Sequence, residues 1–417
     1  MNPDKKKCLS STFGGTARFI PRNRKRGWRN DIISYVLKKW TVCLLILCSL
    51  LPLSGCWSKF ELTERGFVMG VAIDLAKNGD IELLTQIYRP TFAQALTTAT
   101  TTASSINIKT HDQSVMEAIR DIPIHLGRKA QWSHLRVIIV GEKLARSNDL
   151  GHLLDLFYRD HEPRSSVSLM ISKGNAEKMF LKKPLIEQTT AQQFLRVKES
   201  SYHTSAKTID NTLLDLMLQL KSASGDALVA YVYGEDDSKE VFSAAGLALV
   251  KKGKMKVVIP ASKVEGLLML RNVYRSGVVE VKCPSGNGEN ETAEILTFKV
   301  KKKPVIKREQ IAVNIQMEGD IAIGELKCTN ITSTEVEEQF IKQVEAEILR
   351  QLRSTIKFLQ ASQMDVIGVA DEIYRSNPRK WEQLKEDWDD RFAQITFNIK
   401  IKLRLVTSGT ISSKPAG

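Results

Sequence analysis

The chain has 417 residues, of which 42% are hydrophobic and 26% charged, proportions typical of a globular protein. Its formal net charge of +14 at pH 7 is one that nucleic-acid-binding proteins often have. However, residues 1–55 hold eleven Lys and Arg against two Asp, so this segment contributes +9 of the +14 and leaves +5. Since positive charge at a targeting leader serves to keep it cytoplasmic, we expect no nucleic-acid partner.

The leader ends in an uncharged run, residues 41–56, directly after Lys38 and Lys39. This run is shorter than the roughly 20 apolar residues of a membrane-spanning helix, and an apolar run after a basic segment is typical of a secretory signal. It closes on the sequence LSGC at 53–56, which matches the lipobox of bacterial lipoproteins. We therefore expect cleavage before Cys56 and lipidation of Cys56 by a covalent diacylglyceryl group, with no other cofactor. The alternative is an ordinary hydrophobic helix that ends in a cysteine.

The predicted signal peptide, 1–55, is longer than the usual span of about 15–30 residues. Either its basic extension is real, or translation starts downstream at a codon other than Met. Two or three acyl chains on one cysteine make membrane attachment lasting, whereas one chain holds a protein marginally. We expect a body tethered to the outer face of a membrane.

Roughly 360 mature residues exceed what one hydrophobic core usually organises, so more than one domain is expected. The patterning predicts an α+β fold of three domains, each a mixed β-sheet with helices packed against it. Their boundaries are an N-terminal α/β domain at 56–205, a middle one at 206–290 and a C-terminal one at 291–417.

In the first domain, two apolar runs flank Asn78-Gly79, which predicts a β-hairpin. A Thr-rich tract follows as a loop, and helices alternate with buried strands after it. The expected elements are strands 66–76 and 81–88, a loop at 94–105, a helix from 112, strand 135–141, helical residues 142–159 and strand 167–171.

The middle domain begins with an amphipathic helix and ends in a polar loop that marks a boundary. Its expected elements are helix 209–220, strands 227–234, 242–250 and 255–259, helix 261–272, strand 276–282 and loop 284–290. The C-terminal domain has the clearest periodicity, with alternating strands around a long apolar stripe of helical spacing. Its expected elements are strand 311–317, a helix over 336–359 capped by Thr334, helix 378–390 and strand 395–405.

The expected mature chain has three cysteines, Cys56, Cys283 and Cys328. With Cys56 lipidated, the one possible disulfide joins Cys283 to Cys328. Export permits a disulfide, but two cysteines give no framework signal, so pairing and two free thiols both remain open.

No catalytic or metal-binding pattern emerges from the residues. His161-Glu162 lacks the second histidine of the zinc-protease motif, no phosphate loop, dinucleotide fingerprint or nucleophile elbow is present, and the six histidines have no ligand spacing. The ionisable segment 159–164 could serve acid/base chemistry, but a polar junction between a helix and a strand, held by ion pairs, is the favoured interpretation.

Two further clusters have alternative interpretations. Lys301-Lys302-Lys303, on an expected hairpin, could meet anionic headgroups, but a solvated turn is the more common role of such a run. Trp381 and Trp388 lie seven residues apart on one helical face, and core packing is favoured over a ligand platform.

Several segments together resemble the Ger(x)C family, the lipoprotein C subunits of nutrient germinant receptors in spore-forming bacteria. At the lipobox, CWSKFEL is similar to the family's C-W-D-x-x-E-L, with Ser58 in place of the usual Asp. Residues 127–142, 159–164 and 245–254 resemble three internal blocks. Residues 364–372 and 377–381 resemble D-x-x-G-x-G followed by P-x-x-W, with Ala370 where the family commonly has glycine, which implies a tighter or shifted turn there.

The resemblance implies three mixed domains, no enzymatic activity, and assembly with the integral-membrane A and B subunits of a receptor. It places the chain on the outer face of the spore inner membrane, in an assembly or signalling role, with the membrane subunits binding the nutrient. Two competing hypotheses are a solute-binding lipoprotein of a transporter, which needs two similar lobes, and a cell-surface hydrolase, which needs a catalytic pattern.

Overall fold

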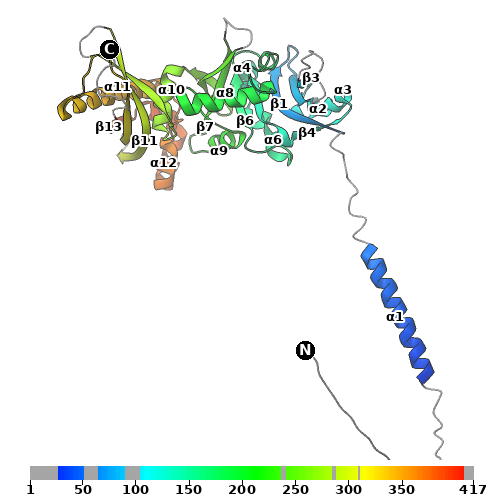
Figure 1. Cartoon of the computed structure of the whole chain (residues 1–417). Coiled ribbons are helices and arrows are strands. Elements are labelled where there is room, and N and C mark those ends of the chain that lie inside the picture. Colours follow the sequence, from blue (N-terminus) through cyan, green and yellow to red (C-terminus); the bar gives the residue numbers. More distant parts are fainter. Residues whose placement is uncertain are drawn as a thin grey trace, which may run out of the picture. The chain divides into compact units, whose positions relative to one another are not determined.

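A computed structural model describes residues 27–50, 64–89, 104–235, 241–283, 288–308 and 310–407. The chain divides into two compact units, Met1–Leu62 and Thr63–Gly417. In the first unit, α1 (Gly27–Leu50) is a helix that includes most of the apolar run (Figure 1). Within the described residues, no helix is both long and apolar enough to cross a membrane. Cys56 and the rest of the lipobox lie outside the described residues, so cleavage and lipidation stay predictions.

The second unit contains two β-sheets, and the first of them has the order β3-β2-β1-β5-β6-β7-β8-β9, with β4 also paired to β1. Strands β1, β5, β6 and β7 are parallel to one another. At one edge β2 and β3, and at the other β8 and β9, each pair antiparallel with their neighbours. The strands are β1 (Arg65–Leu75), β2 (Ile81–Tyr88), β3 (Ser105–Asp112), β4 (Lys129–Gln131), β5 (Val137–Gly141), β6 (Ser168–Ser172), β7 (Asp226–Gly234), β8 (Phe242–Lys251) and β9 (Lys254–Ile259).

Helices cover both faces of this sheet because successive residues of its buried strands point to opposite sides. In β5, Ile138 and Val140 belong to one apolar cluster, whereas Val137 and Ile139 belong to another. The first face is covered by α2 (Val115–Arg120), α3 (Ile122–Leu126), α4 (Glu142–Ser147), α5 (Leu150–Leu153), α6 (Asp155–Arg159) and α9 (Leu213–Leu220). The second face is covered by α7 (Ala176–Phe180) and α8 (Thr190–Ser205), and a short 3-10 turn, η4 (Trp132–His134), precedes β5.

The second sheet has the order β10-β11-β12-β13, in which β12 and β13 are parallel. Its strands are β10 (Gly277–Lys282), β11 (Asn290–Lys307), β12 (Gln310–Glu325) and β13 (Thr396–Thr407). The helices of this part are α10 (Ala261–Leu270), α11 (Thr334–Ala361), α12 (Val369–Ser376), α13 (Pro378–Leu384) and α14 (Trp388–Ala393), with the 3-10 turn η5 (Lys385–Asp387). One apolar cluster includes residues of both sheets and of α10, so the sheets share a core.

The long helix α11 confirms the stripe read from the sequence, since Phe340, Val344, Ile348 and Leu352 are all buried. Its N-cap is Ser333 rather than the predicted Thr334, because the Ser333 side chain accepts from the backbone N–H of Val336. The predicted hairpin around Asn78-Gly79 is also confirmed, as β1 and β2 pair antiparallel.

The segment 206–290 does not form the sheet of its own that we expected. Strand β7 pairs in parallel with β6 and thereby continues the first sheet, whereas β10 pairs with β11 and begins the second. The described residues therefore form two sheets, and the mixed α+β class is confirmed. The division into three domains stays a prediction.

Candidate functional site: a buried polar junction between the sheets

The segment between α11 and α12, residues 362–368, brings charged groups from both sheets together, and we call it the junction loop. Gln363 and Gly368 have positive φ angles of 52° and 78°, which turn the chain sharply at both ends of the loop. At Gly368 the left-handed conformation favours glycine, which explains this glycine of the motif. Ala370 lies one residue inside α12 and needs no such freedom, so the tighter or shifted turn expected there does not occur.

Asp365 lies at the centre of the junction loop and is almost fully buried, with 2% of its surface exposed. Its two carboxylate oxygens accept the backbone N–H groups of Val369 and Ala370, at 3.0 and 2.6 Å. These N–H groups have no partner within α12, because the first turn of a helix leaves its donors free. Burial raises the pKa of Asp365, and both hydrogen bonds oppose that rise.

Asp226, the first residue of β7, connects the first sheet to the junction loop. Its Oδ2 accepts the backbone N–H of Asp365 at 2.7 Å. Its Oδ1 has no hydrogen-bond partner among the described residues. Burial raises the pKa of Asp226 to about 7, although Lys251 opposes the rise. This carboxyl group therefore changes its charge near neutral pH.

Two cations from other elements donate to carbonyl groups of the same loop. Arg271, at the end of α10, donates to the carbonyl oxygen of Val366, and Lys302 of β11 donates to that of Ile367. Burial lowers the pKa of both side chains, while the Asp365 carboxylate favours their charged forms. The junction loop is thus held by side chains of β7, α10 and β11.

Further contacts join the end of the first sheet to the C-terminal helices. Lys251 of β8 donates to the carbonyl oxygen of Gln363 at 2.6 Å and pairs with Asp389 at 2.7 Å. The backbone N–H of Ala223 donates to Asp371 of α12 at 2.9 Å. A movement of one sheet would therefore strain contacts of the other.

This junction does not have the form of a catalytic site. Both oxygens of Asp365 are occupied by the start of α12, and Asp226 contacts a backbone N–H rather than the second carboxyl group. Both carboxyl groups are too deeply buried to meet a substrate. What the arrangement can do is couple the positions of the two sheets and respond to protonation of Asp226.

The ionisable segment 159–164 is the polar junction favoured from the sequence. Glu162 accepts the backbone N–H of Trp132 at 3.0 Å and pairs with Lys129 at 3.4 Å. Arg159 pairs with Asp155 within α6, while His161 is 96% exposed. These contacts hold a connection between α6 and β6 and do not assemble an acid/base site.

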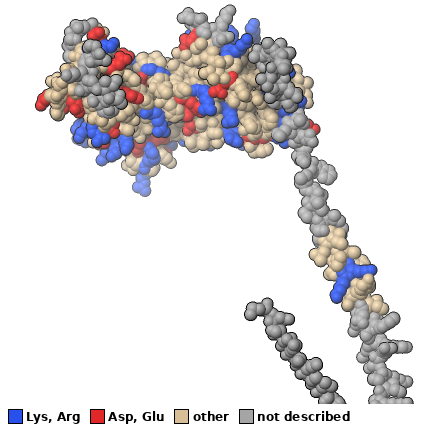
Figure 2. Space-filling view, in the orientation of Figure 1, with Lys and Arg blue, Asp and Glu red and all other residues tan. Residues whose placement is uncertain are grey.

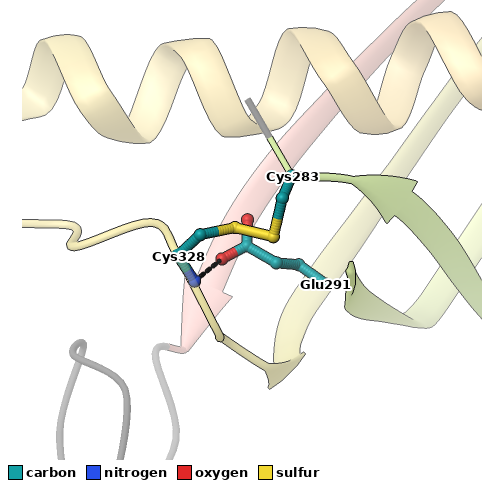
Figure 3. A group of neighbouring side chains, drawn as sticks. All are labelled: Cys283, Glu291 and Cys328. Carbon is teal, nitrogen blue, oxygen red and sulfur yellow. Dashed lines mark hydrogen bonds between the residues drawn. A yellow bond between two sulfur atoms is a disulfide. The ribbon is translucent and has the colours of Figure 1, made fainter. Parts of the chain in front are cut away.

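Cys283 and Cys328 form a disulfide beside Glu291 (Figure 3), which settles the alternative left open by the sequence. The carboxylate of Glu291 accepts the backbone N–H groups of Lys327, Cys328 and Thr329 at 3.1, 3.0 and 2.6 Å. Although these three residues have metal-ligand chemistry, a disulfide offers no thiolate, and the carboxylate is occupied by backbone donors. The group therefore holds the segment after β12 against β11.

Removing this disulfide is expected to lower stability. The bond closes a loop of 45 residues, which corresponds to about 4 kcal/mol in the chain-entropy treatment and commonly 2–4 kcal/mol in practice. We expect a variant with Cys283→Ser and Cys328→Ser to lose about 2–4 kcal/mol of unfolding free energy, measured by denaturant titration under oxidising conditions. The wild-type chain under reducing conditions should lose a similar amount; an unchanged midpoint in both would contradict a stabilising disulfide.

Trp381 and Trp388 are both buried and meet edge to face at 5.0 Å, so the core interpretation is confirmed. Lys301, Lys302 and Lys303 lie within β11 rather than on a turn, and Lys302 points into the junction. Figure 2 shows Lys and Arg interspersed with Asp and Glu on the visible face of the body, with several basic side chains along its lower edge near β11 and α12.

A pocket of about 620 Å³ lies between α5, α6, α9 and the β8–β9 turn. Its apolar part includes Met217 and Leu220, and His152 is its single histidine. Asp155 is paired with Arg159, and Asp149 accepts the N–H of His152 as a helix cap.

The sequence reasoning missed Asp226, Arg271 and the buried role of Lys302. One signal was available, because Asp226 directly precedes the uninterrupted apolar run of β7, where a charge needs a partner. No local pattern indicated which residue would be that partner.

Two family descriptions match consecutive parts of the chain. "Spore germination protein N-terminal domain" matches residues 58–233, and "Spore germination B3/ GerAC like, C-terminal" matches residues 245–409. Spore germination protein B3 of Bacillus subtilis (strain 168) is 25% identical over 87% of this chain and 96% of its own length. Spore germination protein KC of the same organism is 21% identical over 90% of this chain and 97% of its own length.

Among solved structures, the crystal structure of the GerBC protein is similar with a TM-score of 0.55 and 22% identity. The similarity covers 81% of this chain and 97% of the GerBC chain, and it supports the fold. The junction loop, with its Asp365 and Gly368, lies inside the second matched part. With both parts matched in order over most of its length, this chain belongs to the Ger(x)C family of spore germination proteins.

Proposed function

We propose that this protein is the lipid-anchored C subunit of a nutrient germinant receptor, with an assembly or signalling role and no enzymatic activity. The single observation that carries the proposal is the match of both family parts, in order, directly behind the Cys56 lipobox. In this proposal a diacylglyceryl group on Cys56 attaches the body to the outer face of the spore inner membrane. Its partners there are the integral-membrane A and B subunits.

The geometry of the described residues supports a non-enzymatic role. At the junction the carboxyl groups of Asp226 and Asp365 are buried, and both oxygens of Asp365 accept backbone donors. Such a junction suits a subunit that transmits a change of position between two packed sheets. The alternative of a solute-binding lipoprotein has less support, because nine strands in one sheet and four in the other are not two similar lobes.

The anchor can be tested with the variant Cys56→Ala in the full chain. We expect it to lose the lipid, leave the membrane fraction of spores and weaken nutrient-induced germination, while the body stays folded because Cys56 precedes its first strand. The measurements are intact mass of the N-terminal peptide, membrane fractionation and germination rate.

Cys43→Ala is the matched control, since this exposed cysteine of α1 lies within the predicted signal peptide. The control should keep lipidation, fractionation and germination of the wild-type chain. If Cys56→Ala remained membrane-bound through its own polypeptide, residues 41–56 would be a membrane helix and the lipoprotein proposal would fail.

A further inference from the structure

The end of the first sheet at which β1 begins carries large apolar side chains in contact with water. Ile124 of α3 is 75% exposed, and Leu185 and Ile186, in the loop between α7 and α8, are 55% and 89% exposed. Isolated exposed apolar residues are common, but several that gather at one end of a protein indicate an interaction surface.

The loop that carries Leu185 and Ile186 is held in place by buried side chains. Gln193 of α8 accepts the backbone N–H groups of Ile186 and Glu187 at 3.1 and 3.3 Å. Thr190 donates its hydroxyl to the carbonyl oxygen of Lys182 at 3.0 Å. Because Gln193 and Thr190 are buried, these hydrogen bonds hold the backbone of the loop, while Leu185 and Ile186 stay exposed.

This loop lies close to the first residues of β1. Phe67 of β1 is opposite Tyr88 of β2, which is opposite Ser105 of β3, and the neighbouring Ser104 donates to the carbonyl oxygen of Gln188. The loop contacts the residue before β3, and β3 lies two strand spacings, about 10 Å in all, from Phe67 of β1.

Ile124 flanks the same end of β1 from the other face of the sheet. It precedes β4, whose Lys129 is paired in register with Arg65, and α3 and β4 lie beside the beginning of β1 in Figure 1. Ile122 of α3 packs in the cluster on one face, whereas Phe180, just before the loop, packs in the cluster on the other.

The chain itself limits how far this end can lie from the proposed lipid. Cys56 and Arg65 are nine residues apart, which an extended chain spans in at most about 32 Å. Exposed basic residues are near both apolar tips in the sequence: Lys178 on α7 and Lys183 in the loop, and Arg120 at the end of α2 and Arg128 after α3. Glu187, the acidic residue of the loop, is paired with Arg196. Basic side chains around apolar tips match a bilayer with anionic headgroups.

We propose that this end of the body rests on an anionic lipid bilayer, with Ile124 on one face of the sheet and Leu185 and Ile186 on the other entering the interfacial region. The proposal rests on the proposed lipid anchor, because the short tether is what keeps this end near the membrane. The lipid and the two apolar tips together would fix the orientation of the body, which a flexible tether cannot do.

A fluorescent probe at each tip tests this contact. In the proposed mature chain Cys56 is lipidated, and Cys283 is bound to Cys328. A cysteine introduced by Ile186→Cys or Ile124→Cys is therefore its one free thiol. Val278→Cys is the matched control, since Val278 is 51% exposed on β10 of the other sheet. Each variant is labelled with an environment-sensitive dye and reconstituted in its lipidated form into phosphatidylglycerol vesicles, with and without a quencher on the acyl chains.

We expect blue-shifted emission and strong quenching at positions 186 and 124, and emission typical of water with little quenching at 278. High salt should reduce the quenching at both tips without releasing the lipidated protein. If the protein floats with the vesicles while all three probes stay in water, the contact does not exist although the anchor does. If the protein fails to float and its N-terminal peptide lacks lipid, the proposed anchor fails first. Equal quenching at all three positions would overturn the specific orientation.

Discussion

Replacing Asp365 with alanine is expected to lower the free energy of unfolding by about 3–5 kcal/mol. The change leaves the N–H groups of Val369 and Ala370 without acceptors at the buried start of α12. It also removes the carboxylate that favours the charged forms of Arg271 and Lys302. Because the junction loop joins the sheets, we expect both sheets to lose this stability together, in one cooperative unfolding transition. The measurement is a denaturant titration monitored by circular dichroism.

Glu372→Ala is the matched control for this prediction. Glu372 lies on α12, the helix whose first N–H groups Asp365 accepts, but Glu372 pairs with Arg375, whose side chain is 67% exposed, so its removal should cost less than about 1 kcal/mol. A loss for Asp365→Ala as small as that of the control would mean that the junction loop keeps its conformation without the carboxylate.

Asp226→Asn is expected to stabilise the protein clearly more at pH 8 than at pH 5. The folded-state pKa of Asp226 is about 7, above the value of 3.8 for the unfolded chain. The folded state therefore binds more protons than the unfolded state between these values, and stability falls as pH rises toward 7. At about 1.4 kcal/mol per pKa unit, the cost of the ionised carboxylate above pH 7 is on the order of 4 kcal/mol, and asparagine removes it.

The measurement for this prediction is the difference in unfolding free energy between the variant and the wild-type chain, followed from pH 5 to pH 8. The difference in unfolding free energy cancels the contributions of groups that both proteins share and that do not interact with Asp226. We expect it to grow with pH in favour of the variant, since asparagine can still accept the N–H of Asp365. A difference that does not change with pH would show that Asp226 is ionised throughout this range.

The elements with strong periodicity were predictable because their burial pattern is local. The stripe of α11, the alternation of β13 and the Asn-Gly turn between β1 and β2 each depend on residues a few positions apart. Caps were less certain: Ser333 and Thr334 are both good capping residues, and one residue separates the prediction from the observed N-cap. The helical residues 142–159 were found, but they form three short helices, α4 to α6.

Sheet membership could not be read in the same way. The apolar run of β7 fits a buried strand of any parallel sheet, and its pairing with β6 is decided by the hydrogen bonds and packing of distant segments. The disulfide was equally undetermined, because two cysteines 45 residues apart give no information about their distance in space.

By itself, the sequence determined the mixed α+β class, the main elements and, through motifs in a consistent order, the family, and it predicted the leader. The tertiary structure alone decided that Asp226, Arg271 and Lys302 meet at the junction loop, and that Ile124, Leu185 and Ile186 are exposed. The physical reason is the range of the interactions. Periodicity and turns act between near neighbours, whereas the partner of a buried charge or an exposed tip comes from a segment of the chain that only folding brings close.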